Sequence, residues 1–318
     1  MTHTEQAVEE RTAAGGGGKR GGKALTEGAR AERRLGWLLC APAVIVMVAV
    51  TAYPIGYAIY LSLQRSDLRF PAASKFIGLS NYATVLSSGF WWRALVVTVI
   101  ITVISVAVEF AFGMGLALLM HRTIWGKGGV RTAILVPYGI VTIAAGFGWQ
   151  YAWTPGVGYL AELLPTGSAP LTDSAQAIGL IILAEIWKTT PFMALLLLAG
   201  LALVPEELLN AAKVDGASPW QRFTKVMVPL MKPAILVALL FRTLDAFRIF
   251  DNIYALTLGA HGTGSVSILG YDNLFTALNL GIGSTISVLI FICVGIIAFA
   301  FIKLFGASTP GSDLKEAG

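Results

Sequence analysis

Charged residues are scarce in this sequence. Only 13% of the 318 residues are Asp, Glu, Lys or Arg, whereas a soluble domain usually carries about 25%. Hydrophobic residues make up 56% of the chain, and long apolar runs recur along it, which is typical of transmembrane helices. The composition excludes an ordinary soluble domain and predicts an all-α polytopic protein of the cell membrane, embedded in the lipid bilayer. The formal net charge of +5 fits the loops of such a protein and requires no nucleic acid.

Side chains that perform chemistry are also few. The two cysteines, Cys40 and Cys293, lie inside apolar runs without the spacing of metal ligands, so we interpret them as small buried hydrophobic residues. The glycine-rich stretch before Lys23 approaches a phosphate-binding loop, but Ala24 stands where that loop needs a magnesium-binding hydroxyl. The sequence offers no set of nucleophile and base. We therefore predict a non-catalytic chain that holds no metal and no cofactor.

Six apolar segments are long enough to cross a membrane. They predict transmembrane helices at about 35–62, 92–120, 131–152, 177–203, 233–257 and 281–305. The first segment resembles a secretory signal, but we favour an uncleaved anchor because its apolar character continues past Ala52. Residues 1–34 are too rich in Gly to bury a core and predict a disordered cytoplasmic tail, with a second tail at 307–318. We expect one transmembrane domain over residues 35–306.

Basic residues predict how the chain is oriented. Cytoplasmic loops of membrane proteins collect Lys and Arg. Three regions that must share one side are basic, and their cations are Arg30, Arg33, Arg34, Arg122, Lys127, Arg131, Lys213, Arg222, Lys225 and Lys232. The first loop on the other side fits poorly, since it holds Arg65, Arg69, Lys75 and Arg93. On balance we expect both termini in the cytoplasm.

A polar elbow interrupts the apolar segments at residues 204–232. Its centre reads NAAKVDGASPWQRFTKVMVP. Pro205 is suited to the start of a helix, and Gly216 is suited to end that helix in the left-handed conformation. Ser218 is expected to cap a second short helix whose first residue is Pro219.

The second helix of the elbow is expected to end before the fifth span, at Pro229 and Pro233. It carries an apolar stripe at three- and four-residue spacing, formed by Trp220, Phe223, Val226 and Met227. Small residues surround the bend and let another protein approach closely. An ordinary polar loop, usually a few residues long, is the alternative. The caps, turn and stripe together favour a docking surface.

The elbow resembles the cytoplasmic EAA signature of permease subunits in binding-protein-dependent ABC importers. The matching segments are Asn210-Ala211-Ala212, Asp215-Gly216-Ala217 and Val226-Met227-Val228-Pro229. The resemblance implies a type I permease fold and an elbow that sits in a groove on a separate ATPase subunit. It implies coupling roles for Asn210, Ala211, Ala212, Asp215, Gly216, Ala217, Phe223 and Pro229. Asn210 replaces the Glu of the signature, so an ion pair made by that Glu cannot be carried over.

Segments outside the elbow resemble the sugar-permease branch of these importers, and most of all the trehalose importers of mycobacteria. They are APAVIVMVAVTAYPIGYAIYLSL, AEIWKTTPF, RTLDAFRIFDNIYALT, YAWTPGVGYL and GSVSILGYDNLF. The resemblance implies a sugar substrate, with trehalose expected. It also implies a second permease subunit, a dimer of ATPase subunits that carry ATP and magnesium, and an extracytoplasmic sugar-binding protein.

Charged residues inside the predicted spans are the candidate substrate site. Charges at membrane depth are costly unless they are paired or hydrated. Arg242, Asp245 and Ile249 share one stripe of span five, with Arg248 and Asp251 beside it at a spacing that allows ion pairs. A second stripe in span four includes Lys188. The resemblance to sugar permeases places Glu185, Thr189, Phe192, Arg242, Asp245 and Ile249 at the substrate cavity.

Two other interpretations of these charges remain open. They can form a purely structural network between helices, and Glu109 in span two is expected to bond a neighbouring helix. A self-sufficient secondary transporter would use Asp245, Glu185 or Glu109 as proton sites. Against that function, the sequence shows no inverted repeat, and the elbow would have no purpose.

Overall fold

The computed structural model describes residues 27–122, 127–165 and 167–305, and nearly all of their regular structure is helical, as predicted. The helices are α2 (Glu27–Ser62), α3 (Ser80–Ser87), α4 (Gly89–Arg122), α5 (Lys127–Gly139), α6 (Thr142–Ala152), α7 (Ser174–Leu201), α8 (Glu206–Val214), α9 (Pro219–Arg222), α10 (Val228–Phe247), α11 (Asp251–Thr257), α12 (Val266–Tyr271) and α13 (Leu280–Phe305). The short turns are η1 (Pro71–Ala73), η2 (Ala161–Leu163), η3 (Phe223–Met227) and η4 (Asp272–Thr276), and the strands are β1 (Gln64–Arg65) and β2 (Lys75–Phe76). The predicted C-terminal tail lies outside the described residues, and α2 begins inside the predicted N-terminal tail.

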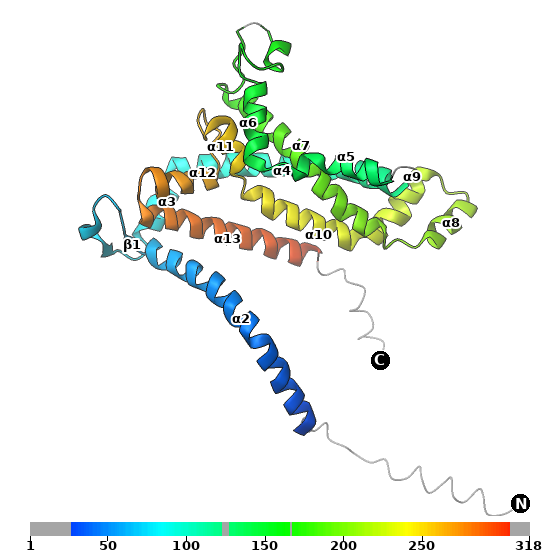
Figure 1. Ribbon diagram of the computed structural model, residues 1–318, viewed down its shortest axis with the longest axis horizontal. Coiled ribbons are helices and arrows are strands. Elements are labelled where there is room, and N and C mark those ends of the chain that lie inside the picture. The colour runs from blue at the N-terminus through cyan, green and yellow to red at the C-terminus, as the bar shows by residue number, and fades with distance from the viewer. Residues whose placement is uncertain (1–26, 123–126, 166, 306–318) are drawn as a thin grey trace, which may run out of the picture. The chain divides into compact units, whose positions relative to one another are not determined.

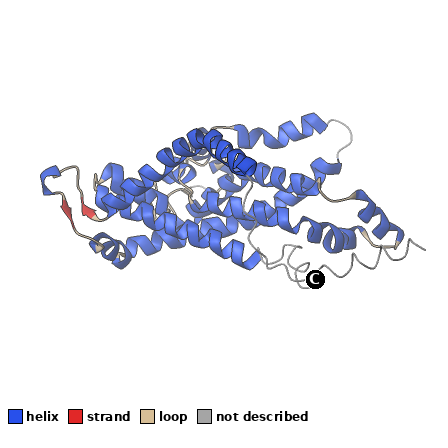
Figure 2. Cartoon of the chain, turned by 90° about the horizontal axis from the view of Figure 1, so that it is seen from below, coloured by secondary structure: helices blue, strands red, loops and turns tan. Residues whose placement is uncertain are grey.

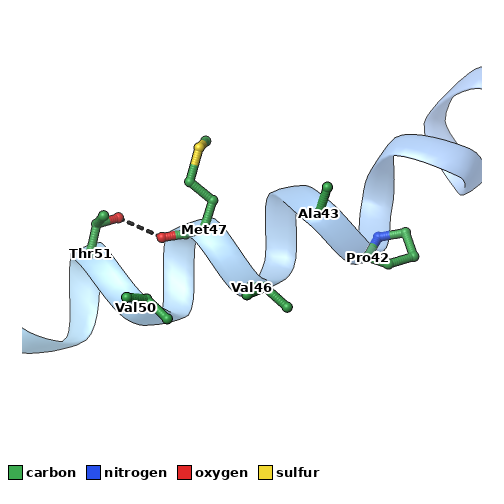
Figure 3. A pocket seen from close by; sticks show the side chains of 6 residues that line it. All are labelled: Pro42, Ala43, Val46, Met47, Val50 and Thr51. Carbon is green, nitrogen blue, oxygen red and sulfur yellow. Dashed lines mark hydrogen bonds between the residues drawn. The ribbon is translucent and has the colours of Figure 1, made fainter.

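The chain divides after Gly56 into two parts. The first part holds most of α2. In the most apolar 18-residue stretch of this helix between Arg34 and Ser62, no residue is buried. A shallow apolar hollow runs along this helix (Figure 3) and is lined by Pro42, Ala43, Val46, Met47, Val50 and Thr51. Within it the Thr51 hydroxyl donates to the Met47 carbonyl at 2.7 Å. A helix this apolar and this exposed is suited to lipid or to another helix.

Five helical stretches of the described residues are long and apolar enough to cross a membrane. They are Arg34–Ser62, Gly89–Arg122, Ser174–Leu201, Pro219–Phe247 and Leu280–Lys303. A sixth span is present if the bent pair α5–α6 counts as one. The length and apolarity of the helices therefore agree with a polytopic protein.

The predicted third span is not one helix. Helices α5 and α6 meet at 84° across a break of a few residues, so the prediction of a single helix at 131–152 is wrong. Figure 1 shows α6 turned away from the direction of α5. Pro137 lies in the last turn of α5 and lacks a backbone N–H, which weakens the helix just before the break at Gly139.

The predicted fifth span has different bounds at both ends. At its start, α9, η3 and α10 form one continuous helical stretch from Pro219 to Phe247, so Pro229 and Pro233 do not end the second elbow helix. The turn η3 is a π-helix, in which the Val228 N–H donates to the Phe223 carbonyl. This wider turn places Pro229 in the first positions of α10, where its missing N–H is tolerated.

At its far end the fifth span stops early. Helix α10 ends at Phe247, and α11 starts after a short turn at Asp251, so one helix over 233–257 is also wrong. The Ile249 carbonyl in this turn accepts a hydrogen bond from the Ser265 hydroxyl at 2.9 Å. The Ser265 hydroxyl thus supplies the hydrogen bond that the Ile249 carbonyl would accept from a backbone N–H in a continuous helix.

The core of the second part is formed where α4, α7 and α10 pack together. Its buried apolar residues include Val106, Met114, Met193, Leu197, Leu201, Met231 and Ala238. Helices α7 and α10 are in close contact at Gly200, where an added Cβ would lie 2.5 Å from the Ala234 Cβ. A small residue is required there, as is common where membrane helices cross.

A short hairpin lies at the end of the second part that is away from the elbow, where Figure 2 shows the two strands in red. The Asn81 amide fixes its base by donating to the Ser62 and Gln64 carbonyls at 2.8 Å each. Asp67 and Arg69 form an exposed ion pair at 2.6 Å. The hydrogen bond from the Arg69 side chain lowers the pKa of Asp67 to about 2, so this carboxylate stays charged at neutral pH.

Candidate functional site

Arg242 is the centre of a buried charge cluster that joins α4, α7 and α10. Its side chain is 0% exposed. The Nε atom donates to Glu109 Oε2 at 2.5 Å, and Nη2 donates to Glu109 Oε1 at 3.0 Å. Nη2 also donates to Glu185 Oε1 at 2.6 Å. Two carboxylates from two other helices therefore neutralise one buried guanidinium, as a charge at this depth requires.

Neutral polar groups complete the cluster. Thr189 Oγ1 accepts from Arg242 Nη2 at 3.0 Å and lies 2.8 Å from Glu109 Oε1. The Asn252 side-chain amide, at the start of α11, donates to Glu185 Oε2. The cluster thus ties the helix after the break to the same carboxylate that holds Arg242.

Asp245 differs from the other members because it is open. Arg242 Nη1 donates to Asp245 Oδ2 at 2.6 Å, yet the Asp245 side chain is 70% exposed while that of Arg242 is 0% exposed. The cluster therefore has a dry inner side and one carboxylate at its surface. That carboxylate can accept hydrogen bonds from a bound molecule without losing its tie to Arg242.

The structure brings four of the six predicted substrate residues together, and they are Glu185, Thr189, Arg242 and Asp245. Phe192, one helical turn beyond Thr189, is half-buried and stacks on Tyr138 with ring centroids 5.3 Å apart. Ile249 lies instead in a buried apolar group with Ile253 and Leu256.

Glu109 was expected to bond a neighbouring helix, and it does so through Arg242. The sequence carries a signal for this position, because polar residues recur on the same face of α4 at Thr98, Thr102 and Ser105. Two ion pairs were expected within span five, Asp245 with Arg248 and Arg248 with Asp251, and neither is present among the ion pairs of the described residues. Arg242 pairs with Asp245, whereas Arg248 forms no ion pair among the described residues. Because α10 ends at Phe247, Arg248 and Asp251 do not share one helix.

Lys188 supports the break between α5 and α6 rather than the cluster. Its buried ammonium donates to the Ile140 carbonyl at 2.6 Å and to the Tyr138 carbonyl at 3.3 Å. These carbonyls lie where α5 ends and cannot be satisfied by a continuing helix. A cation at the C-terminus of a helix is favourable for the same reason.

The elbow has the local structure that the sequence predicts. Gly216 has φ +82°. Its N–H donates to the Lys213 carbonyl at 3.2 Å, and the Ala217 N–H donates to the Ala212 carbonyl at 2.9 Å. This pair of bonds is the Schellman motif of a glycine-ended helix. Ser218 caps the second helix by a reciprocal pair of hydrogen bonds with Gln221.

The elbow also presents an apolar surface. Val214 is 87% exposed and Trp220 is 70% exposed. Phe223 stays half-buried against the core and lies 5.6 Å from the Trp220 ring, measured between centroids. The other predicted coupling residues are exposed or half-exposed, and they are Asn210, Ala211, Ala212, Asp215, Gly216, Ala217 and Pro229. Figure 1 shows α8 and α9 at one end of α10, with α11 and α12 at the other.

Comparison with known proteins agrees with this arrangement. Residues 77–309 match the family described as binding-protein-dependent transport system inner membrane component. The chain is 64% identical over 307 residues to the trehalose transport system permease protein SugA of Mycobacterium tuberculosis, covering 96% of this chain and 98% of that protein. It is 38% identical over 279 residues to the trehalose/maltose transport system permease protein MalF of Thermococcus litoralis, covering 86% and 94%.

A solved structure supports the fold. A chain of a bacterial ABC transporter that imports the acidic polysaccharide alginate has a TM-score of 0.75 at 21% identity, covering 89% of this chain and 100% of that one. Sequence and fold lead to one conclusion. The chain belongs to the family of inner membrane components of binding-protein-dependent transport systems.

Proposed function

We propose that this chain is the permease subunit of an ATP-driven sugar importer and forms half of its translocation path, with trehalose as the substrate. The observation that carries the proposal is the 64% identity, over 96% of the chain, to a protein named as a trehalose permease. The relative at 38% identity is named for trehalose and maltose. Both names agree on a glucose disaccharide.

The residues proposed for the substrate site are Glu185, Thr189, Phe192, Arg242, Asp245 and Ile249, and of these Asp245 and Phe192 are proposed to contact the sugar directly. A sugar carries no charge but many hydroxyls, so it needs fixed donors and acceptors beside an apolar surface. Asp245 meets the first need, because one of its oxygens is held by Arg242 while the side chain stays exposed. Arg242, Glu185 and Thr189 then act by holding Asp245 in place, and the Phe192 ring supplies apolar surface.

The proposed ATPase contact is the elbow. Its Schellman turn fixes the angle between α8 and α9, and its exposed Val214 and Trp220 offer apolar area to a partner. The coupling residues are Asn210, Ala211, Ala212, Asp215, Gly216, Ala217, Phe223 and Pro229. The chain itself performs no ATP chemistry in this proposal, because ATP and magnesium bind to the partner.

The proposed assembly contains a second permease, two ATPase subunits and an extracytoplasmic sugar-binding protein. It lies in the cell membrane with both termini of this chain in the cytoplasm, which places the elbow beside the ATPases. A related alginate importer is described in complex with a sugar-bound periplasmic protein, and the same kind of delivery is proposed here.

The test is ATP hydrolysis by the purified complex in lipid nanodiscs. We expect hydrolysis to rise when the sugar-binding protein and trehalose are added together, and to stay low with either alone. Sucrose serves as the control disaccharide. Stimulation by sucrose but not by trehalose would reject the substrate, and a chain that purifies without an ATPase from its native membrane would reject the assembly.

A further inference from the structure

Four aromatic side chains form a continuous group at the end of α10 that is away from the elbow. Phe250 lies 5.3 Å from Tyr254 and 5.1 Å from Tyr271, measured between ring centroids. Tyr271 lies 5.5 Å from Tyr254 and 4.9 Å from Phe275. None of these residues belongs to the substrate site proposed above. The group joins α11 to α12 and η4, three elements that follow the end of α10.

The group is buried at one end and open at the other. Phe250 and Tyr254 pack against the buried apolar residues around Ile253. Phe275 at the other end is 66% exposed. The last ring of the group is therefore accessible to a bound molecule, while its other end is anchored in the apolar core.

A π-helical turn sets the position of the open ring. Residues Asp272–Thr276 form η4, closed by the Ala277 N–H donating to the Asp272 carbonyl at 2.7 Å. Across this turn the Phe275 ring lies beside the Tyr271 ring, with centroids 4.9 Å apart. Turns of this kind are rare and are frequent at functional sites.

Exposed charged residues adjoin the group along the chain, since Arg248 and Asp251 flank Phe250. Asp245, Arg248 and Asp251 are all exposed, and charges at membrane depth do not face lipid. Asp251 lies three residues before Tyr254 on α11, so the two are neighbours on the helix surface. The exposed Asp272 adjoins Tyr271, whose ring packs edge-on against Tyr254. This face thus combines open aromatic surface with hydroxyl and carboxylate groups.

We propose that Phe250, Tyr254, Tyr271 and Phe275 form an entry subsite on which a pyranose ring of the sugar stacks before it reaches Asp245. The subsite rests on the proposed function. A pyranose has an apolar C–H face and a rim of hydroxyls. The Phe275 and Tyr271 rings match the apolar face, while the tyrosine hydroxyls and the Asp272 carboxylate accept or donate at the rim.

Uptake of labelled trehalose by cells that carry the complete importer tests the subsite. Phe275→Ala is expected to lower the maximal uptake rate about three- to tenfold, the range that loss of one aromatic contact produces. Phe299→Ala is the matched control, because Phe299 on α13 is also 66% exposed and lies outside the subsite. The melting temperature of both variants should equal that of the wild type, since neither ring is buried.

A second measurement does not depend on transport rate. In a chain with Cys40→Ser and Cys293→Ser, trehalose should slow maleimide labelling of Phe275→Cys at least about threefold. It should leave labelling of Tyr159→Cys unchanged, since Tyr159 is 68% exposed and lies outside the membrane-crossing helices. Unchanged labelling and unchanged uptake for the Phe275 variants, in an importer whose wild type takes up trehalose, would overturn the subsite alone. A wild type that takes up no trehalose would overturn the proposed function and the subsite with it.

Discussion

At the scale of single residues, Arg242 and Asp245 form one ion pair but differ in burial, and this difference predicts different effects when each is replaced. Arg242 bonds Glu109 and Glu185 in a site that is 0% exposed at Arg242. Its loss strands two carboxylates where water does not reach, and breaking a buried pair costs about 3–5 kcal/mol. Asp245 is 70% exposed at its side chain, so water can replace it.

Arg242→Ala is therefore expected to lose stability, whereas Asp245→Ala is expected to lose transport activity. The first should lower the melting temperature and the yield of the purified complex. The second should leave both unchanged and reduce sugar uptake strongly. Thermal unfolding and sugar uptake are measured for each variant. Glu162→Ala is the control, because it removes another exposed carboxylate. Normal uptake by Asp245→Ala would remove Asp245 from the substrate path, and a stable Arg242→Ala would contradict the buried network.

The sequence predicted part of this cluster and missed part of it. Helical spacing and the resemblance to sugar permeases placed Glu185, Thr189, Arg242 and Asp245 together. The bond between Glu109 and Arg242 joins positions 133 residues apart, and no local pattern specifies which buried cation a lone acid will meet. Lys188 was grouped with the cluster but instead bonds carbonyls freed by a helix break that the sequence did not predict.

At the scale of elements, the elbow was predictable and the helix breaks were not. The Schellman turn at Gly216 and the cap at Ser218 use residues within a few positions of each other, so the sequence alone specifies them. The breaks after Gly139 and Phe247 depend on distant groups, namely Lys188 and Ser265, that satisfy the freed carbonyls. The hydropathy of the sequence stays high across such breaks, so it predicts one continuous helix.

Gly216→Val is expected to uncouple the chain from its ATPase. A β-branched residue is strained at the positive φ of this position, by about 1–2 kcal/mol, although an added Cβ would meet nothing within 4 Å. The strain should distort the angle between α8 and α9. Co-purification of the ATPase subunit and sugar uptake are measured together.

Gly216→Asn is the matched control, because Asn tolerates the left-handed conformation. It should keep both ATPase binding and uptake. If Gly216→Val also keeps both, the turn has no role in coupling.

Lys188→Met is expected to loosen the break between α5 and α6. The substitution keeps a long side chain but leaves the Tyr138 and Ile140 carbonyls without their buried donor, at a cost of about 2–4 kcal/mol. Lys188→Arg should retain most of the stability, because it restores a cation with donors. The readouts are melting temperature and the rate of proteolysis between residues 139 and 142. Equal behaviour of the Met and Arg variants would show that the ammonium does not hold the break.

At the scale of the whole molecule, the chain is expected neither to bind nor to hydrolyse ATP by itself. The glycine-rich stretch before Lys23 resembles a phosphate-binding loop, but it ends in Ala24, which cannot bind magnesium. This stretch lies outside the described residues. The isolated chain should show no saturable binding of labelled ATP in equilibrium dialysis. The complex with the ATPase subunits is the positive control. Saturable binding to the chain alone would refute the assignment of ATP to the partner.

In the proposed assembly, the continuous helical run from the elbow into α10 is suited to act as a lever. It has 29 residues, about 44 Å at about 1.5 Å per residue. Ala234, seated against Gly200, lies near its midpoint and is placed to serve as the fulcrum. A tilt of about ten degrees would move the two ends by about 4 Å in opposite directions. A push on Trp220 by an ATPase would therefore swing Asp245 the other way, with neither end needing to bend.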